Sequence, residues 1–313
     1  MRIFDKPNIN FIRWRWQAIA LSVAVILAGA VTIIARGGLP LGVDFTGGTV
    51  IVVDFVNPVS EDDIRSALGT DDVVVQRFGP VSENQIMVRL PIREGETDIA
   101  EAARTVAEQL RASGIGEFTP VSSELVSATI GADLRRKAIL ATVTAIGGIL
   151  LYIGWRFRFS FAAGAIVATV HDILVTLVFL SWFGYDLSLN IVAAILTIAG
   201  YSVNDTVVIF DRVRENQRAA RREGLETVVN RAVNETLSRT VITAGTTLLA
   251  VSALFLFGGE VLEGFAFTMI VGVIAGTYST VFIASSVAIL LSGRRTPPAA
   301  AAPADGRRRR AGA

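Results

Sequence analysis

The hydrophobic positions of this chain gather in long, nearly uncharged runs rather than in an alternating or amphipathic pattern. A helix needs about 20 apolar residues to cross a bilayer, and six runs approach or exceed this length. They are residues 17–35, 138–155, 161–183, 187–210, 240–257 and 265–291. The first run is too long for a typical signal peptide and lacks a small-residue cleavage site, so we expect a retained transmembrane helix.

Positive charges fall in alternate connections between these runs, which predicts the orientation of the chain. Lysines or arginines occur in residues 1–16, in the connection at 156–158, in the segment 211–239 and in the tail 292–313, whereas the connections at 184–186 and 258–260 have none. Short loops rich in lysine and arginine stay in the cytoplasm. Both termini are therefore expected to be cytoplasmic, and residues 36–137 periplasmic.

Residues 36–137 have the patterning of a small α+β domain between the first two spans. β-Branched runs predict strands at 49–56, 73–78, 85–90 and 118–125, and capped or amphipathic stretches predict helices at 60–68 and 98–112. This βαββαβ order is that of a ferredoxin-like domain. The domain contains no histidine and no cysteine, so we expect it to bind or interact rather than catalyse.

The composition agrees with a polytopic α-helical membrane protein of six transmembrane helices. The chain is 52% hydrophobic and 18% charged, with a mean hydropathy of +0.54, which excludes a soluble globular or a disordered protein. The net charge of +1 gives no reason to expect nucleic-acid binding. The absence of cysteine excludes disulfides, thiol catalysis and cysteine metal sites, and we expect neither a metal nor a cofactor.

Asp205 lies inside the fourth apolar run, where a carboxylate costs roughly 2.5–3.5 kcal/mol even on the most lenient insertion scale. Helical spacing places Thr197, Tyr201, Asn204, Asp205 and Val208 along one stripe. Tyr201 and Asn204 are therefore candidates to hydrogen-bond Asp205 in either protonation state. The alternative is a polar contact that only joins two helices.

A second polar stripe begins the fifth run, at Arg239, Thr243, Thr246 and Thr247. Arg239 lies at the same side of the membrane as Asp205, and consecutive helices are often neighbours, so Arg239 is the candidate counter-charge. The alternative is an arginine that extends to the membrane interface.

His171, the single histidine, and Asp172 lie in the middle of the third run. Histidine titrates near neutral pH and can pass a proton, so these two residues and Asp205 predict a proton relay. Consecutive helical residues point about 100° apart, from which we expect His171 and Asp172 to face different partners. The alternative for His171 is a hydrogen bond that serves packing only.

Three further features concern packing and surfaces. Gly147 and Gly148, and Gly272 with Gly276, predict close helix contacts. The arginine-rich segment 211–239 predicts one or two amphipathic helices lying on the inner membrane surface. The proline- and alanine-rich tail 292–313 is typical of disorder.

Three motifs closely resemble the SecF family of the bacterial Sec protein-export machinery, within the resistance–nodulation–division superfamily. They are GVDFTGGT at 42–49, AGYSVNDTVVIFDRVREN at 199–216 and TLSRT at 236–240. The resemblance implies a multi-pass subunit of the bacterial inner membrane. It implies SecD, the SecYEG channel, the translocating preprotein and the lipid bilayer as partners, and protons as the coupling ion.

The same resemblance implies how the chain works. Such a subunit uses the proton-motive force to promote export and release of preproteins on the periplasmic side. Asp205 and Arg239 match the family's proton-coupling carboxylate and its basic partner. Transporters of the superfamily have two six-span halves, so a chain with one half requires a membrane partner.

Three other readings compete with this one. A proton-coupled small-molecule or lipid exporter of the same superfamily would need larger outer domains. An intramembrane aspartyl protease using Asp172 and Asp205 would carry Gly-x-Gly-Asp, whereas residues 202–205 read Ser-Val-Asn-Asp. A structural scaffold leaves three ionisable residues within the membrane without a role.

Overall fold

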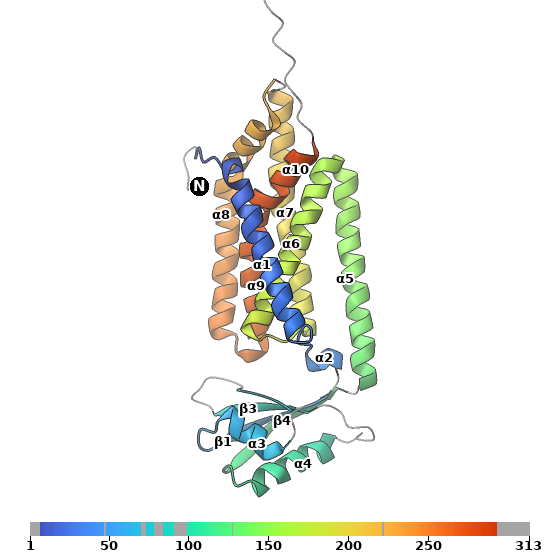
Figure 1. Cartoon of the computed structure of the whole chain (residues 1–313), viewed down its shortest axis with the longest axis vertical. Coiled ribbons are helices and arrows are strands. Elements are labelled where there is room, and N and C mark those ends of the chain that lie inside the picture. Colours follow the sequence, from blue (N-terminus) through green and yellow to red (C-terminus); the bar gives the residue numbers. More distant parts are fainter. Residues whose placement is uncertain are drawn as a thin grey trace, which may run out of the picture.

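The computed structural model describes residues 7–46, 48–69, 73–77, 84–90, 99–126, 128–220 and 222–292. The tail for which we predict disorder lies, from residue 293 onward, outside the described residues. The described chain has two parts, a bundle of long helices and an α+β domain at one end of it (Figure 1). The amino-terminal residues lie at the opposite end of the bundle (Figure 1).

Six helices in the described part of the chain are long and apolar enough to cross a membrane, which confirms the prediction of a polytopic helical membrane protein. A short turn at Ile12–Trp14 leads into the first of them. Their bounds are α1 Arg15–Ala35, α5 Ala128–Arg156, α6 Phe159–Phe183, α7 Leu189–Ala219, α8 Leu225–Phe257, and α9 Glu260–Ser279 with its continuation.

The last spanning helix contains a feature that its apolar pattern does not reveal. A π-helical turn, η3 (Thr280–Ala284), separates α9 from α10 (Ser285–Leu291). The wider turn leaves backbone carbonyls without the usual helical partner, and the hydroxyl of Ser285 donates to the carbonyl of Thr280 at 3.1 Å. Hydropathy counts side chains and not backbone hydrogen bonds, so the sequence gives no signal for this turn.

The segment 211–239 does not form a separate surface unit, which corrects our expectation. α7 continues to Ala219 and α8 already begins at Leu225, so both spanning helices extend beyond their apolar runs. The arginines of the two extensions bind acidic residues: Arg212 donates to Glu235 at 2.6 Å, and Arg231 pairs with Glu223. These pairs let charged residues continue a helix that the apolar pattern alone would end.

The α+β domain follows α1 through a short helix, α2 (Val43–Thr46). Its elements are β1 Gly48–Phe55, α3 Glu61–Leu68, β2 Val74–Arg77, β3 Gln85–Leu90, α4 Ile99–Ala112 and β4 Phe118–Val126. The strands form one antiparallel sheet in the order β2-β3-β1-β4. The order of elements along the chain is the one that the sequence pattern predicts.

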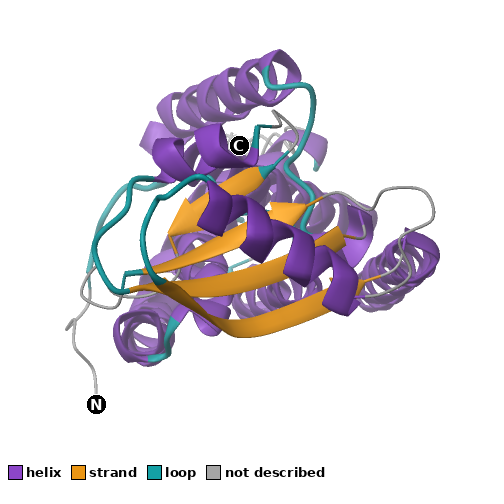
Figure 2. Ribbon diagram, turned by 90° about the horizontal axis from the view of Figure 1, so that it is seen from below, coloured by secondary structure: helices purple, strands orange, loops and turns teal. Residues whose placement is uncertain are grey.

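The core of this domain lies between the sheet and its two helices. Alternating residues of β1, Ile51, Val53 and Phe55, face α3 and α4, where Ile64 and Leu110 are fully buried. Figure 2 shows both helices covering the face of the sheet that points away from the bundle. The other face of the sheet therefore points towards the spanning helices.

Glycines set the closest contacts in the bundle. A Cβ on Gly272 of α9 would lie 2.1 Å from the Ile198 side chain of α7, and one on Gly276 would lie 3.1 Å from Ser202. A Cβ on Gly147 or Gly148 of α5 would meet nothing within 4 Å among the described residues. The predicted close approach therefore holds at Gly272 and Gly276 but not on α5, which is exposed along most of its length.

Candidate functional site

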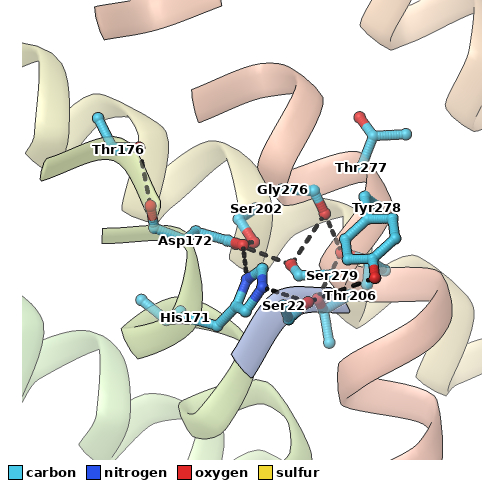
Figure 3. A network of polar contacts seen from close by, with 12 residues as sticks. Ser22, His171, Asp172, Thr176, Ser202, Thr206, Gly276, Thr277, Tyr278 and Ser279 are labelled. Atoms are coloured by element: carbon cyan, nitrogen blue, oxygen red, sulfur yellow. Dashed lines mark hydrogen bonds and ion pairs between the residues drawn. The ribbon is translucent and has the colours of Figure 1, made fainter. Parts of the chain in front are cut away.

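The side chains of His171 and Asp172, in the middle of α6, are hydrogen-bonded to each other (Figure 3). Nδ1 of His171 lies 2.9 Å from Oδ1 of Asp172, and Nε2 lies 2.9 Å from the hydroxyl of Ser22 on α1. The Asp172 side chain is completely buried and that of His171 nearly so. An imidazole bonded at both nitrogens is held in one orientation and can exchange a proton at each side.

Two further hydroxyls bind the second carboxylate oxygen of Asp172. Ser202 of α7 donates to Oδ2 at 2.5 Å and Ser279 of α9 donates to the same atom at 2.9 Å. Ser279 is the last residue of α9 before the π-helical turn. Four spanning helices, α1, α6, α7 and α9, thus meet at one carboxylate and its histidine (Figure 3).

A tyrosine extends this network on the α1 side. The hydroxyl of Tyr278 lies 3.3 Å from the hydroxyl of Ser22 and donates to the carbonyl of Ala18 at 2.7 Å. The ring of Tyr278 stacks on that of His171, with centroids 6.1 Å apart. The pair of ionisable residues is therefore surrounded by polar groups that come from α1, α7 and α9.

His171 and Asp172 have separate partners on other helices and also contact each other. We expect consecutive residues of a helix to face different partners, and their outer atoms do: Ser22 on one side, Ser202 and Ser279 on the other. The two side chains nevertheless also bind each other.

Asp205 forms a second buried site on α7. Its side chain accepts a hydrogen bond at Oδ1 from the hydroxyl of Thr240 on α8, at 3.0 Å. Its Oδ2 atom is buried and has no hydrogen-bond partner among the described residues. Burying an oxygen without a hydrogen bond is costly. This oxygen can therefore accept one more hydrogen bond or carry a proton.

Arg239 does not bind Asp205, contrary to the expected ion pair. Arg239 is exposed on α8, and among the described residues no ion pair joins the two. Its neighbour Thr240 faces Asp205 instead. Adjacent residues of a helix point about 100° apart, so Thr240 meets Asp205 while the Arg239 guanidinium stays beyond ion-pair distance, although its charge still acts on the carboxylate.

The supporting polar residues make no described hydrogen bond to Asp205 either, although Tyr201 is near enough for the Asp205 charge to act on its hydroxyl. Asn204 is exposed on α7, and Tyr201 is half-buried near Thr247 and Thr277. Thr243 is half-buried one turn after Thr240. None of the three donates a described hydrogen bond to the carboxylate, so Thr240 has the role that we expect for Tyr201 and Asn204.

The serines and Thr240 are the residues that the sequence does not reveal. In apolar helices most hydroxyls bind the carbonyl one turn earlier, as Thr246 does with Ile242 at 2.9 Å. A hydroxyl that crosses to another helix therefore has the same local pattern as one that does not. Only the packing of the helices shows that Ser22, Ser202 and Ser279 bind a side chain on another helix, unlike hydroxyls that bind their own backbone.

At the end of the bundle near the α+β domain, a hydrogen bond joins the connection between α6 and α7 to the first turn of α9. The hydroxyl of Tyr185, between α6 and α7, donates to Glu263 of α9 at 2.6 Å. Burial, together with this hydrogen bond and the charge of Glu263, raises the pKa of the Tyr185 hydroxyl. The hydroxyl therefore remains a donor at physiological pH.

Six spanning helices, an α+β domain after the first of them, and two buried ionisable sites shared between helices define a polytopic α-helical membrane protein. Residues 105–294 match the family model described as protein export membrane protein SecD/SecF, C-terminal, and residues 32–59 match the SecD/SecF GG motif. The chain belongs to the SecF family.

Several relatives share nearly the whole chain. A protein translocase subunit SecF of Desulfurispirillum indicum is 40% identical over 297 residues, which cover 93% of this chain and 94% of the relative. The SecF of Rhodothermus marinus is 42% identical, covering 94% and 96%. The SecF of Escherichia coli O157:H7 is 40% identical, covering 91% and 88%.

Two solved structures share the fold. The crystal structure of SecDF from Thermus thermophilus, described as a translocon-associated membrane protein, matches with a TM-score of 0.82 and 35% identity over 94% of this chain. SecDF in a super-membrane-facing form matches with a TM-score of 0.66 and 33% identity over 93%. The chain spans 40% of the length of each of these SecDF chains.

Proposed function

We propose that this chain is an accessory subunit of the bacterial Sec preprotein translocase that works with SecD and uses the proton-motive force to promote export and release of preproteins. The observation that carries the proposal is Asp205, a buried carboxylate in the membrane with one unpartnered oxygen among the described residues, in a chain of the SecF family. Such residues mark proton pathways in membrane proteins.

SecD is the partner that best fits the surface of α7. One face of this spanning helix is exposed and consists of small or polar residues rather than large apolar ones: Asn190, Ala193, Thr197, Gly200 and Asn204. Small residues allow close approach of another helix. The SecDF chains contain more than twice the length of this one, which leaves room for a second set of spanning helices to cover this face.

Orientation follows from the charges. Arg13, Arg15 and the arginines of the α7 and α8 extensions lie at the end of the bundle opposite the α+β domain (Figure 1). With these charges in the cytoplasm, the α+β domain lies in the periplasm of the inner membrane. There it can contact the emerging preprotein or SecD.

We assign this domain to the ferredoxin-like class, which the βαββαβ order and the strand order support.

The energy of a proton is adequate for such work. One elementary charge that crosses the membrane releases about 2.3 kcal/mol per 100 mV. We propose that Asp205 takes up the proton, with Arg239 as a basic partner in another arrangement of α7 and α8. His171 and Asp172 form the second part of the relay.

Translocation of a preprotein into inverted membrane vesicles, with and without a proton gradient, tests the proposal. Asp205→Asn should insert and bind its partner normally but lose the gradient-dependent part of export. Asp211→Asn, on the same helix and in an ion pair with Arg156, is the matched control and should keep it. A full gradient response in Asp205→Asn would remove Asp205 from the mechanism and leave a scaffolding role.

A small-molecule or lipid exporter remains the alternative from sequence. A cavity of about 1050 Å³ lies at the end of the bundle where α1 begins. It is lined by the amino-terminal segment and by charged residues of α7 and α8. The residues that line this cavity lie outside the α+β domain, which an exporter would use to enclose its substrate, so the cavity does not favour this alternative.

A further inference from the structure

The segment between α1 and the α+β domain is bound to the beginning of α7, more than 140 residues later in the chain. The amide of Gly42 donates to the carbonyl of Leu187 at 2.8 Å, and the amide of Leu187 donates to the carbonyl of Pro40 at 2.7 Å. Leu41 and Leu187 form a parallel β-bridge. Two crossed backbone bonds fix this segment in register with the residues that start α7.

Asp44 adds a third bond, at the helix terminus itself. Its carboxylate accepts a hydrogen bond at 2.8 Å from the amide of Leu189, the first residue of α7. The first amides of a helix have no partner within the helix and carry partial positive charge, so a carboxylate there is stabilising. The helix's own cap, Ser188, binds the amide of Ile191, so Asp44 supplies a second cap from a distant part of the chain.

Glycine at position 42 is what allows the two segments to meet. A Cβ at Gly42 would lie 3.0 Å from the carbonyl oxygen of Leu187 and 3.6 Å from the Cα of Ser188. Just before this segment, the guanidinium of Arg36 donates to the carbonyl of Ser181 near the end of α6 at 2.5 Å. The connection from α1 to the α+β domain is therefore bound to both α6 and α7.

α7 connects this contact with both buried sites. The helix is uninterrupted from Leu189 to Ala219 and carries Ser202, which binds Asp172, and Asp205. At 1.5 Å per residue, Leu189 and Asp205 are about 24 Å apart along one helix. On the other side of the contact, α2 ends at Thr46, and β1, an inner strand of the sheet, begins at Gly48.

We propose that Asp44 is a positioning residue that couples α7 to the α+β domain. The inference rests on the proposed proton-driven function. A shift of α7 that accompanies protonation of Asp205 moves its first turn, and Asp44 and the Leu41–Leu187 bridge carry that movement into β1. The link is permanent: it persists in both arrangements, and the domain follows the helix.

The first experiment measures the gradient-dependent part of preprotein export in inverted vesicles that contain the full chain and its partner subunit. Asp44→Ala should reduce the gradient-dependent part of export at least fivefold, because the amide of Leu189 at the start of α7 loses its bond to the α+β side of the chain. Asp44→Asn keeps an oxygen acceptor and should lose about twofold. Glu117→Ala, an exposed carboxylate of the same domain, is the control and should keep the wild-type response.

A disulfide tests the mechanical role separately from helix capping. The chain has no cysteine, so Leu41→Cys with Leu187→Cys introduces a single pair at bridged positions, within the separation that a disulfide spans. When oxidised, this pair should restore gradient-dependent export to Asp44→Ala; when reduced, it should not. With Asp44 intact, the pair should form equally fast with and without a gradient.

Each result bears on one claim. A full gradient response in Asp44→Ala, a disulfide that restores nothing, or a disulfide that forms only without a gradient overturns the permanent link. If Asp205→Asn loses the response while Asp44→Ala keeps it, this inference alone fails. If Asp205→Asn keeps the response, the proposed proton-driven function fails, and gradient-independent formation of the disulfide between positions 41 and 187 still reports whether the link itself is permanent.

Discussion

Thr240 donates a hydrogen bond from its hydroxyl to Oδ1 of Asp205 at 3.0 Å, and this bond joins α8 to α7 inside the bundle. The other carboxylate oxygen of Asp205 is buried and has no described partner. The contact therefore holds the carboxylate in place while one oxygen remains available. A residue that must accept and release a proton needs both properties.

Replacing Thr240 should impair the site without removing its carboxylate. Thr240→Val keeps the shape of the side chain and removes the hydroxyl. A hydrogen bond to a charged group contributes roughly 1.5–3 kcal/mol, so we expect a several-fold loss of gradient-dependent export in vesicles. Thr246→Val on the same helix, whose hydroxyl binds its own backbone, should export like wild type. Equal export by the two variants would mean that Thr240 does not serve Asp205.

Arg239 should matter for export and not for folding. It is exposed and has no described ion pair with Asp205, so Arg239→Gln should change the unfolding free energy by no more than about 0.5 kcal/mol. If Arg239 is the basic partner in another arrangement, the same variant should lose most gradient-dependent export. Thermal unfolding in detergent and vesicle export measure the two effects. A large loss of stability would instead indicate a structural contact.

The Asp172 network should be sensitive to the loss of acceptors more than to the loss of charge. Asp172→Asn keeps an oxygen for Ser202 or Ser279, whereas Asp172→Ala removes the described acceptor of Ser202 and the partner of the His171 Nδ1 atom. Ser279 can still donate to the carbonyl of Gly276. Each unsatisfied buried group costs about 1–3 kcal/mol. We expect Asp172→Ala to lower the melting temperature clearly more than Asp172→Asn does. Equal melting temperatures would show that the network contributes little to stability.

Two glycines in different helices offer a matched test of packing. Gly272→Ala places a methyl group 2.1 Å from Ile198, and overpacking of this kind costs typically about 1–3 kcal/mol. Gly147→Ala meets nothing within 4 Å and should be neutral, or stabilising by up to about 1 kcal/mol, through helix propensity. Thermal unfolding of both variants checks the difference. If Gly272→Ala melts at the wild-type temperature, the close contact between Gly272 and Ile198 of α7 does not contribute to stability.

Much of the architecture is determined by local pattern. Apolar runs of membrane-spanning length predict the six helices, and the β-branched and amphipathic stretches predict the strands and helices of the α+β domain. The ends of α7 and α8 could not be predicted in this way, because ion pairs such as that of Arg212 with Glu235 keep charged residues helical. The π-helical turn at Thr280–Ala284 depends on backbone bonding that no side-chain pattern records.

For the candidate site, the sequence identifies the ionisable residues that lie within apolar runs. Asp205, His171 and Asp172 stand out because charge in an apolar run is costly. Their partners follow from the packing of the helices against one another. Thr240 rather than Arg239 meets Asp205, and three serines from three helices surround the His171–Asp172 pair. The reason is geometric: helical periodicity fixes which residues share a face, but the rotation and depth of each helix against its neighbours are set by packing across the whole bundle.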